Sequence, residues 1–491
     1  MIDNVDILQF SNKGKHSIKN TKKDNNGSRN KEEENTSSEK TQENIISNEE
    51  EPKEEVLFPD KVMNIMFLGL GASSLTTIKI PYYISFIGTF ICILIIGIAN
   101  TWSYYMLYII YEKKKDNNNN EINNYNIWSN VFKNKNIEKI KEIILFIILS
   151  LYSIGEIIIH QILIYRSIGG IINILGGYDF IVKFLSESFF VELTSKCIIN
   201  IGISLFVVFP SYLFYFKNNE KLSNISSIIG VFIIFFIVLT NILQLPFYLT
   251  DFLNKEKDNN YINYYHIEKG FSIFSISQSI GLLFFCFSGH NGLVQVMNIV
   301  YEENKENQEK RIQTYKSLFK YSNFLNSLIY FFISICGYLS TPNDDIDLIT
   351  EKRRFWSKDI IMTITRILLI PLSINKIQFN LYNFIERVFS FFNKEINIKF
   401  NYVIIFTIVF VTLIITSAFS LYNNIIFYIS FIGGLITIPA FLIPPIFMYN
   451  NDDNLFKKDF KYILGIISGV ILCGVGLISS IMEVIILCKN E

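Results

Sequence analysis

The stretch that decides the fold runs from Phe284 to Gln295 and reads FFCFSGHNGLVQ. It lies inside an apolar segment from about Phe271 to Val300, most of which is typical of a membrane-spanning helix. In lipid, such a helix must satisfy its backbone N–H and C=O groups internally. Two glycines nonetheless flank His290 and Asn291 near its centre. Because a break at membrane depth is tolerated only where protein buries it or where it lines a cavity, the stretch predicts a broken helix around an internal site.

The rest of the chain supplies further apolar segments of similar length. The chain has 491 residues, of which 50% are hydrophobic, and these gather in long blocks of Ile, Leu, Phe and Val. Blocks of about 18 residues or more predict transmembrane helices. We therefore expect an all-α polytopic membrane protein. Its 44 basic residues balance 44 acidic ones, so no basic excess points to a nucleic-acid partner.

The apolar blocks divide the chain into about eleven predicted spans. They are placed near 62–84, 86–111, 140–165, 197–216, 224–246, 271–299, 318–340, 359–381, 401–420, 424–449 and 461–487. The short loops carry roughly twenty basic residues on one side of the membrane and about eleven on the other. This asymmetry favours a cytoplasmic N-terminus and a C-terminus on the opposite side.

The first 57 residues differ in composition from the rest. Residues 1–57 are mainly Asn, Lys, Glu and Ser, with almost no aromatic residues. Such a segment cannot bury enough apolar surface to order itself, and it lacks the apolar region of a signal peptide. We expect a disordered cytoplasmic tail over 1–57 and a transmembrane domain over 58–491.

The cysteines and histidines are too scattered to form a metal or disulfide framework. The 6 cysteines include no CxxC pair, and the 4 histidines are dispersed. No nucleophile–base pair is apparent either. We expect no enzyme activity, no metal and no cofactor other than a coupling ion.

The opening span contains a second cluster of small and hydroxyl residues. Ser73, Ser74, Thr76 and Thr77 follow two glycines and precede Pro81. These residues could serve close helix packing. Alternatively the segment is unwound, and its freed amides face a carboxylate, as in transporters whose two halves each contain a discontinuous helix. The break in the sixth span, five helices later, favours the second interpretation.

Two further spans carry ionisable residues, which by default indicate a functional site within a membrane. In the sixth span, His290 either caps a freed carbonyl or titrates and contacts substrate. In the third span, Glu156 and His160 share a helix face near Tyr152. That pair is either structural or the carrier of a coupling proton. We slightly favour the structural interpretation, because one coincidence of spacing is weak evidence for function.

The eighth span and the first span each place a lysine near polar residues. Ser373 and Asn375 are candidates for a cation site or for the cytoplasmic exit. Lys376 and Lys79 are expected to snorkel to the interfaces. For Lys79, an ammonium that replaces a bound Na⁺ is the alternative.

Several motifs in order resemble the amino acid/auxin permease family, which includes sodium-coupled neutral and proton-coupled amino acid transporters. FSGHN at Phe287–Asn291 is similar to that family's aromatic-x-(Gly or Cys)-His signature. The other motifs are IPY at 80–82 with Gly88, FPSYL at 209–213 with Leu222-Ser223 and Ser226-Ser227, VMNIVYEE at 296–303, CGYL at 336–339, and FIGG at 431–434 with IPPIF at 443–447. The resemblance covers about 60–488.

The chain departs from the family pattern at a few positions. Ser74 and Thr76 stand where the family usually has Gly-x-Gly, and Lys79 occupies a usually small position. Asn375 falls where many members have proline. These departures lie where the family binds substrate and ion.

The resemblance implies a fold of the sodium–leucine transporter type, with about 11 helices, a five-plus-five inverted repeat and one extra helix. It implies a secondary active transporter of amino acids, working by alternating access and coupled to H⁺ or Na⁺. The substrate would lie at the midplane between the first, third, sixth and eighth helices. The chain would work as a monomer in a lipid bilayer, in the plasma membrane or in an acidic, vacuole-like compartment.

We assign roles on this basis. The expected carboxylate ligands are Ser73, Ser74, Thr76 and Thr77. The expected ammonium ligands and pocket residues are Phe287, Ser288, Gly289, His290 and Asn291, with Tyr152 and Glu156 opposite. Candidate coupling residues are Glu156, His290, Ser373 and Asn375.

A second function class is an amino-acid-sensing receptor that signals through the tail, and deletion of residues 1–57 distinguishes it from a carrier. A membrane enzyme or a channel is disfavoured, because no catalytic pair or ring-forming filter motif is present.

Overall fold

A computed structural model describes most of the chain after the predicted tail. The described residues are 59–70, 72–117, 122, 126–128, 131–132, 134–174, 201–210, 219–256, 272–305, 307–340, 348–351, 360–392, 398–420, 424–451 and 460–490. The tail predicted over 1–57 and part of the predicted span at 197–216 lie outside them.

The described residues are helical and contain no strand. Six of their helices are long and apolar enough to cross a bilayer, and two shorter ones are apolar. The prediction of a helical, multi-pass membrane protein is thereby confirmed. The main helices are α1 (Pro59–Gly69), α2 (Ala72–Thr76), α3 (Ile80–Asn117), α4 (Lys135–Ile174), α8 (Asn219–Glu256), α9 (Ile273–Cys286), α10 (Leu293–Glu303), α11 (Gln308–Ser340), α12 (Ile360–Phe391), α13 (Ile398–Phe419), α14 (Ile425–Thr437), α15 (Ile443–Asn451) and α16 (Phe460–Asn490).

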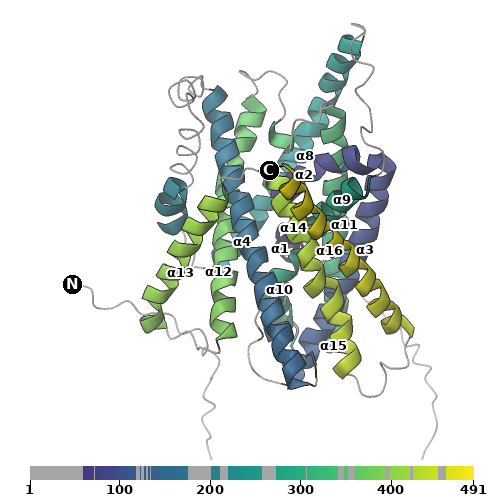
Figure 1. The fold of residues 1–491 in the computed structure, drawn as a ribbon, viewed down its shortest axis with the longest axis vertical. Helices are drawn as coiled ribbons and strands as arrows, with labels where there is room; N and C mark the ends of the chain where they lie inside the picture. Colours follow the sequence, from purple (N-terminus) through teal and green to yellow (C-terminus); the bar gives the residue numbers. More distant parts are fainter. Residues whose placement is uncertain are drawn as a thin grey trace, which may run out of the picture. The chain divides into compact units, whose positions relative to one another are not determined.

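The long helices pack side by side in a bundle (Figure 1). Helix α4 runs along α12, and α14 packs against α9, α16 and α4. Large apolar side chains are exposed on the outside of the bundle, including Ile87 at 74%, Ile98 at 71% and Val403 at 74%. Such an apolar exterior is what a lipid-facing surface requires, because hydrocarbon and not water surrounds it.

Helix α3 is divided near its beginning. Ser85 has φ 66° and ψ 171°, which is not helical, and a positive φ is uncommon for a residue other than glycine. The residue lies between the first two predicted spans, 62–84 and 86–111. The sequence therefore located this boundary correctly.

Glycines bring α9 and α14 into backbone contact. A methyl group added at Gly433 would collide with the Gly281 carbonyl oxygen and lie 2.9 Å from the Phe285 backbone nitrogen. In lipid, the hydrophobic effect does not drive helices together. Transmembrane helices therefore associate through close van der Waals packing, which small residues such as glycine allow. Gly433 belongs to the FIGG motif, so the motif has a packing explanation here.

Replacing Gly433 by Ala is expected to lower the free energy of unfolding by roughly 1–3 kcal/mol, because the added methyl overpacks a backbone contact. Thermal unfolding of the purified protein in detergent measures this. Gly474→Ala is the matched control, since nothing lies within 4 Å of its added methyl. Equal melting temperatures for the two variants would contradict the packing described for α9 and α14.

Candidate functional site

The sixth predicted span is broken where the sequence indicated. Helix α9 ends at Cys286 and α10 begins at Leu293, with one 3-10 turn over Gly289–Asn291 between them. Glycine suits this segment because space is short: a methyl group at Gly289 would collide with the Tyr104 hydroxyl. The broken helix predicted from FFCFSGHNGLVQ is confirmed.

The first span is broken as well, but earlier than predicted. Helix α1 ends at Gly69 and α2 begins at Ala72, so the described break lies at Leu70. The expectation of an unwound segment over Ser73–Thr77 is wrong, because these residues are helical.

The hydroxyl groups of this segment explain why it stays helical. Thr76 and Thr77 donate to the carbonyl oxygens of Ser73 and Ser74, each at 2.7 Å. Threonine hydroxyls can find their hydrogen-bond acceptors in this way among the carbonyl oxygens of the preceding helical turn. The glycines before the segment, not its hydroxyl residues, therefore mark the break.

Tyr330 on α11 joins the two breaks. Its hydroxyl lies 2.9 Å from the Gly69 carbonyl oxygen and 2.6 Å from the Cys286 carbonyl oxygen. These carbonyls belong to the last residues of α1 and α9, where helices leave acceptors without an internal partner. Sequence reasoning missed this residue, since a tyrosine in a predicted span carries no signal of its partners.

Tyr330→Phe is expected to lower the free energy of unfolding by about 1–2 kcal/mol, because it removes the one buried hydroxyl proton that the Gly69 and Cys286 carbonyls share. The ring stays, so its edge-to-face contact with Phe287 at 5.0 Å is retained. Chemical or thermal unfolding in detergent measures the loss. No change in stability would show that the hydroxyl does not hold the breaks together.

A small cavity lies beside the second break. Its walls include Tyr152 and Glu156 of α4, Ser288 and Gly289 of the break, and Lys376 of α12. Its volume of about 10 Å³ is room for about one water molecule. The sequence predicted four of these five residues at a site, and the fold brings them together.

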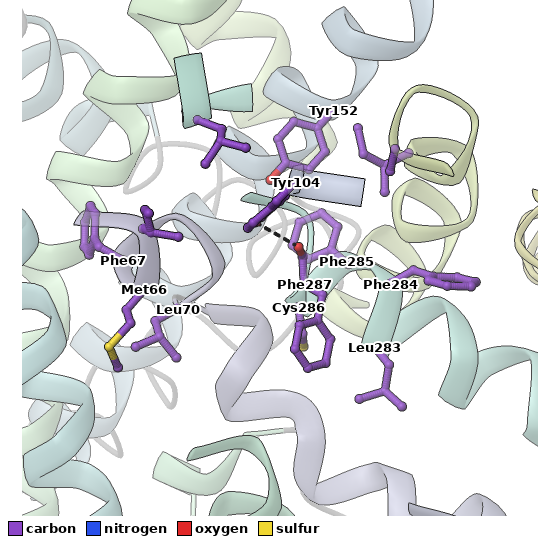
Figure 2. Packing of buried hydrophobic residues seen from close by; sticks show 14 of the residues in the cluster. Met66, Phe67, Leu70, Tyr104, Tyr152, Leu283, Phe284, Phe285, Cys286 and Phe287 are labelled. Atoms are coloured by element: carbon purple, nitrogen blue, oxygen red, sulfur yellow. Dashed lines mark hydrogen bonds between the residues drawn. The ribbon is translucent and has the colours of Figure 1, made fainter. Parts of the chain in front are cut away.

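Hydrogen bonds tie α4 to the break. The Tyr152 hydroxyl lies 3.0 Å from Glu156 Oε1 and 2.9 Å from the Ser288 carbonyl oxygen. Figure 2 shows Tyr152 and Tyr104 beside Phe285 and Phe287, with the hydrogen bond from Tyr104 to the Phe287 carbonyl oxygen drawn as a dashed line. The carbonyls freed by the break therefore accept from tyrosines on two separate helices.

Glu156 and His160 pair on α4 as their spacing predicted. His160 Nδ1 lies 3.3 Å from Glu156 Oε2 and 2.8 Å from the Glu156 carbonyl oxygen. Both residues are buried. Buried ionisable groups must be paired to be tolerated, and here the carboxylate has His160 on one side and Tyr152 on the other.

Lys376 is buried at the site, contrary to expectation. It was expected to snorkel, but it is only 4% exposed. Its ammonium donates to the carbonyl oxygen of Phe67, lies 3.4 Å from that of Leu68, and sits 4.0 Å from the centre of the Phe67 ring. Lys376 therefore places a positive charge on the last carbonyls of α1, next to the first break.

The snorkelling expected for Lys79 is also wrong, because Lys79 is 6% exposed. It lies in the 3-10 turn Thr77–Lys79 that follows α2.

His290 faces a different set of partners. Its Nε2 lies 2.9 Å from the Ser103 hydroxyl oxygen, and the Ser103 hydroxyl donates to the Ala440 carbonyl oxygen. Because that hydroxyl has one proton, Nε2–H is the donor to Ser103. His290 Nδ1 has no hydrogen-bond partner among the described residues. These contacts suit a neutral imidazole that joins the break to α3 and to the π-helical turn Ile438–Leu442.

The remaining predicted residues do not line the cavity. Ser73, Ser74, Thr76 and Thr77 are buried in α2 and the turn after it. Ser373 is buried, and its hydroxyl has no hydrogen-bond partner within the described part of the chain; Asn375 is half-buried. The side chain of Asn291 lies outside the described residues. Across the described ranges, no three His, Cys, Asp or Glu side chains cluster as metal ligands would.

Two ion pairs join helix ends that lie on one side of the breaks. Arg311 of α11 binds Glu112 of α3 through two hydrogen bonds, of 3.1 and 2.9 Å. Lys61 of α1 pairs with Glu303 of α10. Both pairs join the ends of α1, α3, α10 and α11 that lie on the same side of the breaks.

A scan against protein-family models finds no family that matches this chain, and a search of curated proteins finds no matching sequence.

Proposed function

We propose that the chain is a secondary active amino acid transporter of the amino acid/auxin permease type, working by alternating access and coupled to protons. One observation carries the proposal. A buried carboxylate and a buried ammonium, Glu156 and Lys376, face one cavity beside the helix breaks. Ionisable groups inside a membrane protein are costly and mark substrate or ion pathways.

The two charges match a zwitterion. The α-carboxylate of an amino acid would bind toward the Lys376 ammonium, and its α-ammonium toward Glu156 and the Ser288 carbonyl oxygen. The cavity of about 10 Å³ is too small for an amino acid. The described state is therefore a closed one, and substrate would enter when the helices around the breaks separate.

The fold proposed is that of the sodium–leucine transporter type, with about 11 helices and an inverted repeat. Its support is the pair of broken helices, one ending at Gly69 and the other at Cys286. Discontinuous helices at corresponding positions of two halves are typical of that architecture. The ion pair Glu112–Arg311 would serve as one gate, because it joins helices on one side of the breaks.

The position of Lys376 favours H⁺ over Na⁺ as the coupling ion. In transporters with broken helices, the carbonyls at the end of a half-helix coordinate the cation. Here the Lys376 ammonium takes the carbonyls of Phe67 and Leu68. A fixed ammonium supplies the charge that Na⁺ would supply, so the moving charge is a proton. Glu156 is its proposed carrier, faced by His160 and Tyr152 on α4 and by Lys376 on α12.

Uptake into proteoliposomes tests the proposal. The purified full-length chain is reconstituted, and labelled amino acids are added under an imposed pH gradient or an imposed Na⁺ gradient. We expect uptake driven by the pH gradient and unaffected by Na⁺. Such a carrier would suit the plasma membrane or an acidic, vacuole-like compartment. No uptake of any amino acid under either gradient would refute the proposal.

His290→Asn separates a structural role from a proton-carrying one. We expect slower uptake with an unchanged pH profile, because His290 Nε2 donates to Ser103 and its other nitrogen has no hydrogen-bond partner among the described residues. The pH dependence of initial uptake rates measures this. A pH profile that loses a titration in this variant would make His290 the proton carrier instead of Glu156.

A further inference from the structure

A large groove lies on the outer surface of the bundle between α3 and α11. Its volume is about 560 Å³, and residues of these two helices alone line it. The groove is separate from the small cavity at the breaks, with which it shares no lining residue. Leu94, Ile98 and Phe324 line it and are 43%, 71% and 59% exposed. Its walls therefore belong to the surface that faces lipid.

Two lysines stand at one end of the groove. Lys316 and Lys320 are exposed, one helical turn apart on α11, and no carboxylate is among the lining residues. The Lys316 ammonium lies 5.6 Å from the centre of the Tyr105 ring on α3. This end is where α3 approaches its last turns and α11 has just begun, on the same side as the Glu112–Arg311 pair. The charged side chains that line the groove are thus both positive.

The amide of Asn323 lies one helical turn further along α11 than Lys320, on the same face of the helix. Asn323 lines the groove and is 3% exposed. Its Oδ1 accepts a hydrogen bond of 2.9 Å from Asn100, while its Nδ2 has no hydrogen-bond partner among the described residues. A buried amide donor without a partner is unfavourable. Asn323 therefore offers a donor one turn below the lysines.

The length of the groove fits one leaflet. From Leu94 to Tyr105 the α3 wall rises about 16 Å, at 1.5 Å per residue. Half of a hydrocarbon core of about 30 Å is nearly the same length. The order along the groove is thus two cations, an amide donor and an apolar channel, which is the order of phosphate, ester and acyl chain in a lipid.

We propose that this groove binds one anionic glycerophospholipid from the leaflet at the Lys316 end. The lipid's phosphate and its net negative charge lie at Lys316 and Lys320. An ester carbonyl lies level with Asn323, whose buried amide would have to turn outward to donate to it, and an acyl chain lies against Leu94 and Ile98. On this side, where α1 begins and which is expected to be cytoplasmic, phosphatidylserine is the anionic headgroup that basic residues attract.

Native mass spectrometry of the full-length chain in detergent tests the assignment. Phosphatidylserine and phosphatidylcholine with the same acyl chains are added at equal concentrations. We expect one phosphatidylserine to remain bound at about tenfold lower lipid concentration than phosphatidylcholine, since two lysines contribute to the preference. In K316A/K320A the preference is lost. Both positions are exposed, so the fold tolerates the change.

The matched control removes another exposed lysine pair with the same spacing. Lys135 and Lys139 lie one turn apart at the beginning of α4 and do not line the groove. K135A/K139A is expected to keep the tenfold preference. A second readout uses Trp102, which lines the groove: brominated phosphatidylserine should quench its fluorescence in W128F/W356F, and K316A/K320A should remove that quenching. Equal binding of both lipids by the unaltered chain, or an unaltered preference in K316A/K320A, would overturn the proposal.

Discussion

Replacing Glu156 by Gln is expected to lower the rate of amino acid uptake by about 100-fold or more. The carboxylate lies between the Tyr152 hydroxyl and His160, and it shares a cavity with Lys376. The variant removes both the proposed proton carrier and the proposed ligand of the substrate ammonium, and a loss of about 3 kcal/mol at the rate-limiting step corresponds to about 100-fold in rate. The amide is nearly isosteric, so Tyr152 keeps a partner and the protein should fold.

A second buried carboxylate supplies the control. Glu483 on α16 is 2% exposed and does not line the cavity. Glu483→Gln makes the same chemical change at another buried position and should keep uptake. Initial rates in proteoliposomes, normalised to the protein reconstituted, measure both variants. If Glu156→Gln transports as fast as Glu483→Gln, the carboxylate is not part of the transport site.

Replacing Lys376 by Met is expected to abolish uptake and to lower the free energy of unfolding by about 3 kcal/mol. Methionine fills similar space but leaves the Phe67 and Leu68 carbonyls without their charged donor, and each unsatisfied group costs about 1–3 kcal/mol. It also leaves Glu156 without the opposite charge across the cavity. Thermal unfolding and uptake assays give the two parts of the result separately.

Comparison with Lys79→Met shows which lysine acts at the breaks. Lys79 is also buried but does not line the cavity, so its loss should leave the uptake rate closer to that of the unaltered chain. In the double variant E156Q/K376M, both charges are absent. We expect its loss of stability to be smaller than the sum of the single losses by about 1–3 kcal/mol, as for residues that interact. Additive losses of stability would show that the two charges do not interact.

Much of the fold could be predicted because bilayers impose simple rules. Apolar blocks long enough to cross a membrane predicted the helices. The glycines of the stretch from Phe284 to Gln295 predicted a helix break, and because lipid does not tolerate unpaired backbone groups, the break had to lie inside the protein. The i, i+4 spacing of Glu156 and His160 predicted their contact. Each of these rests on local pattern alone.

The site depended on contacts that local pattern does not encode. Lys376 stands near the expected inner boundary of its span, where snorkelling is the usual solution, and only the packing of α12 against α4 and α8 brings its side chain to the end of α1. Tyr330 reaches two carbonyls that are far away in sequence. The hydroxyl cluster Ser73–Thr77 led to a wrong prediction of an unwound segment, because threonine hydroxyls can also donate hydrogen bonds to carbonyl oxygens of the preceding helical turn.

Proton flux driven by amino acids is the decisive measurement for the proposed transport function. Proteoliposomes loaded with a pH-sensitive dye receive single proteinogenic amino acids at equal pH on both sides, without Na⁺. The site described predicts that at least one amino acid acidifies the lumen, and that Glu156→Gln abolishes the signal while Glu483→Gln keeps it. A lumen that stays at constant pH with every amino acid tested would contradict proton-coupled amino acid transport by this protein.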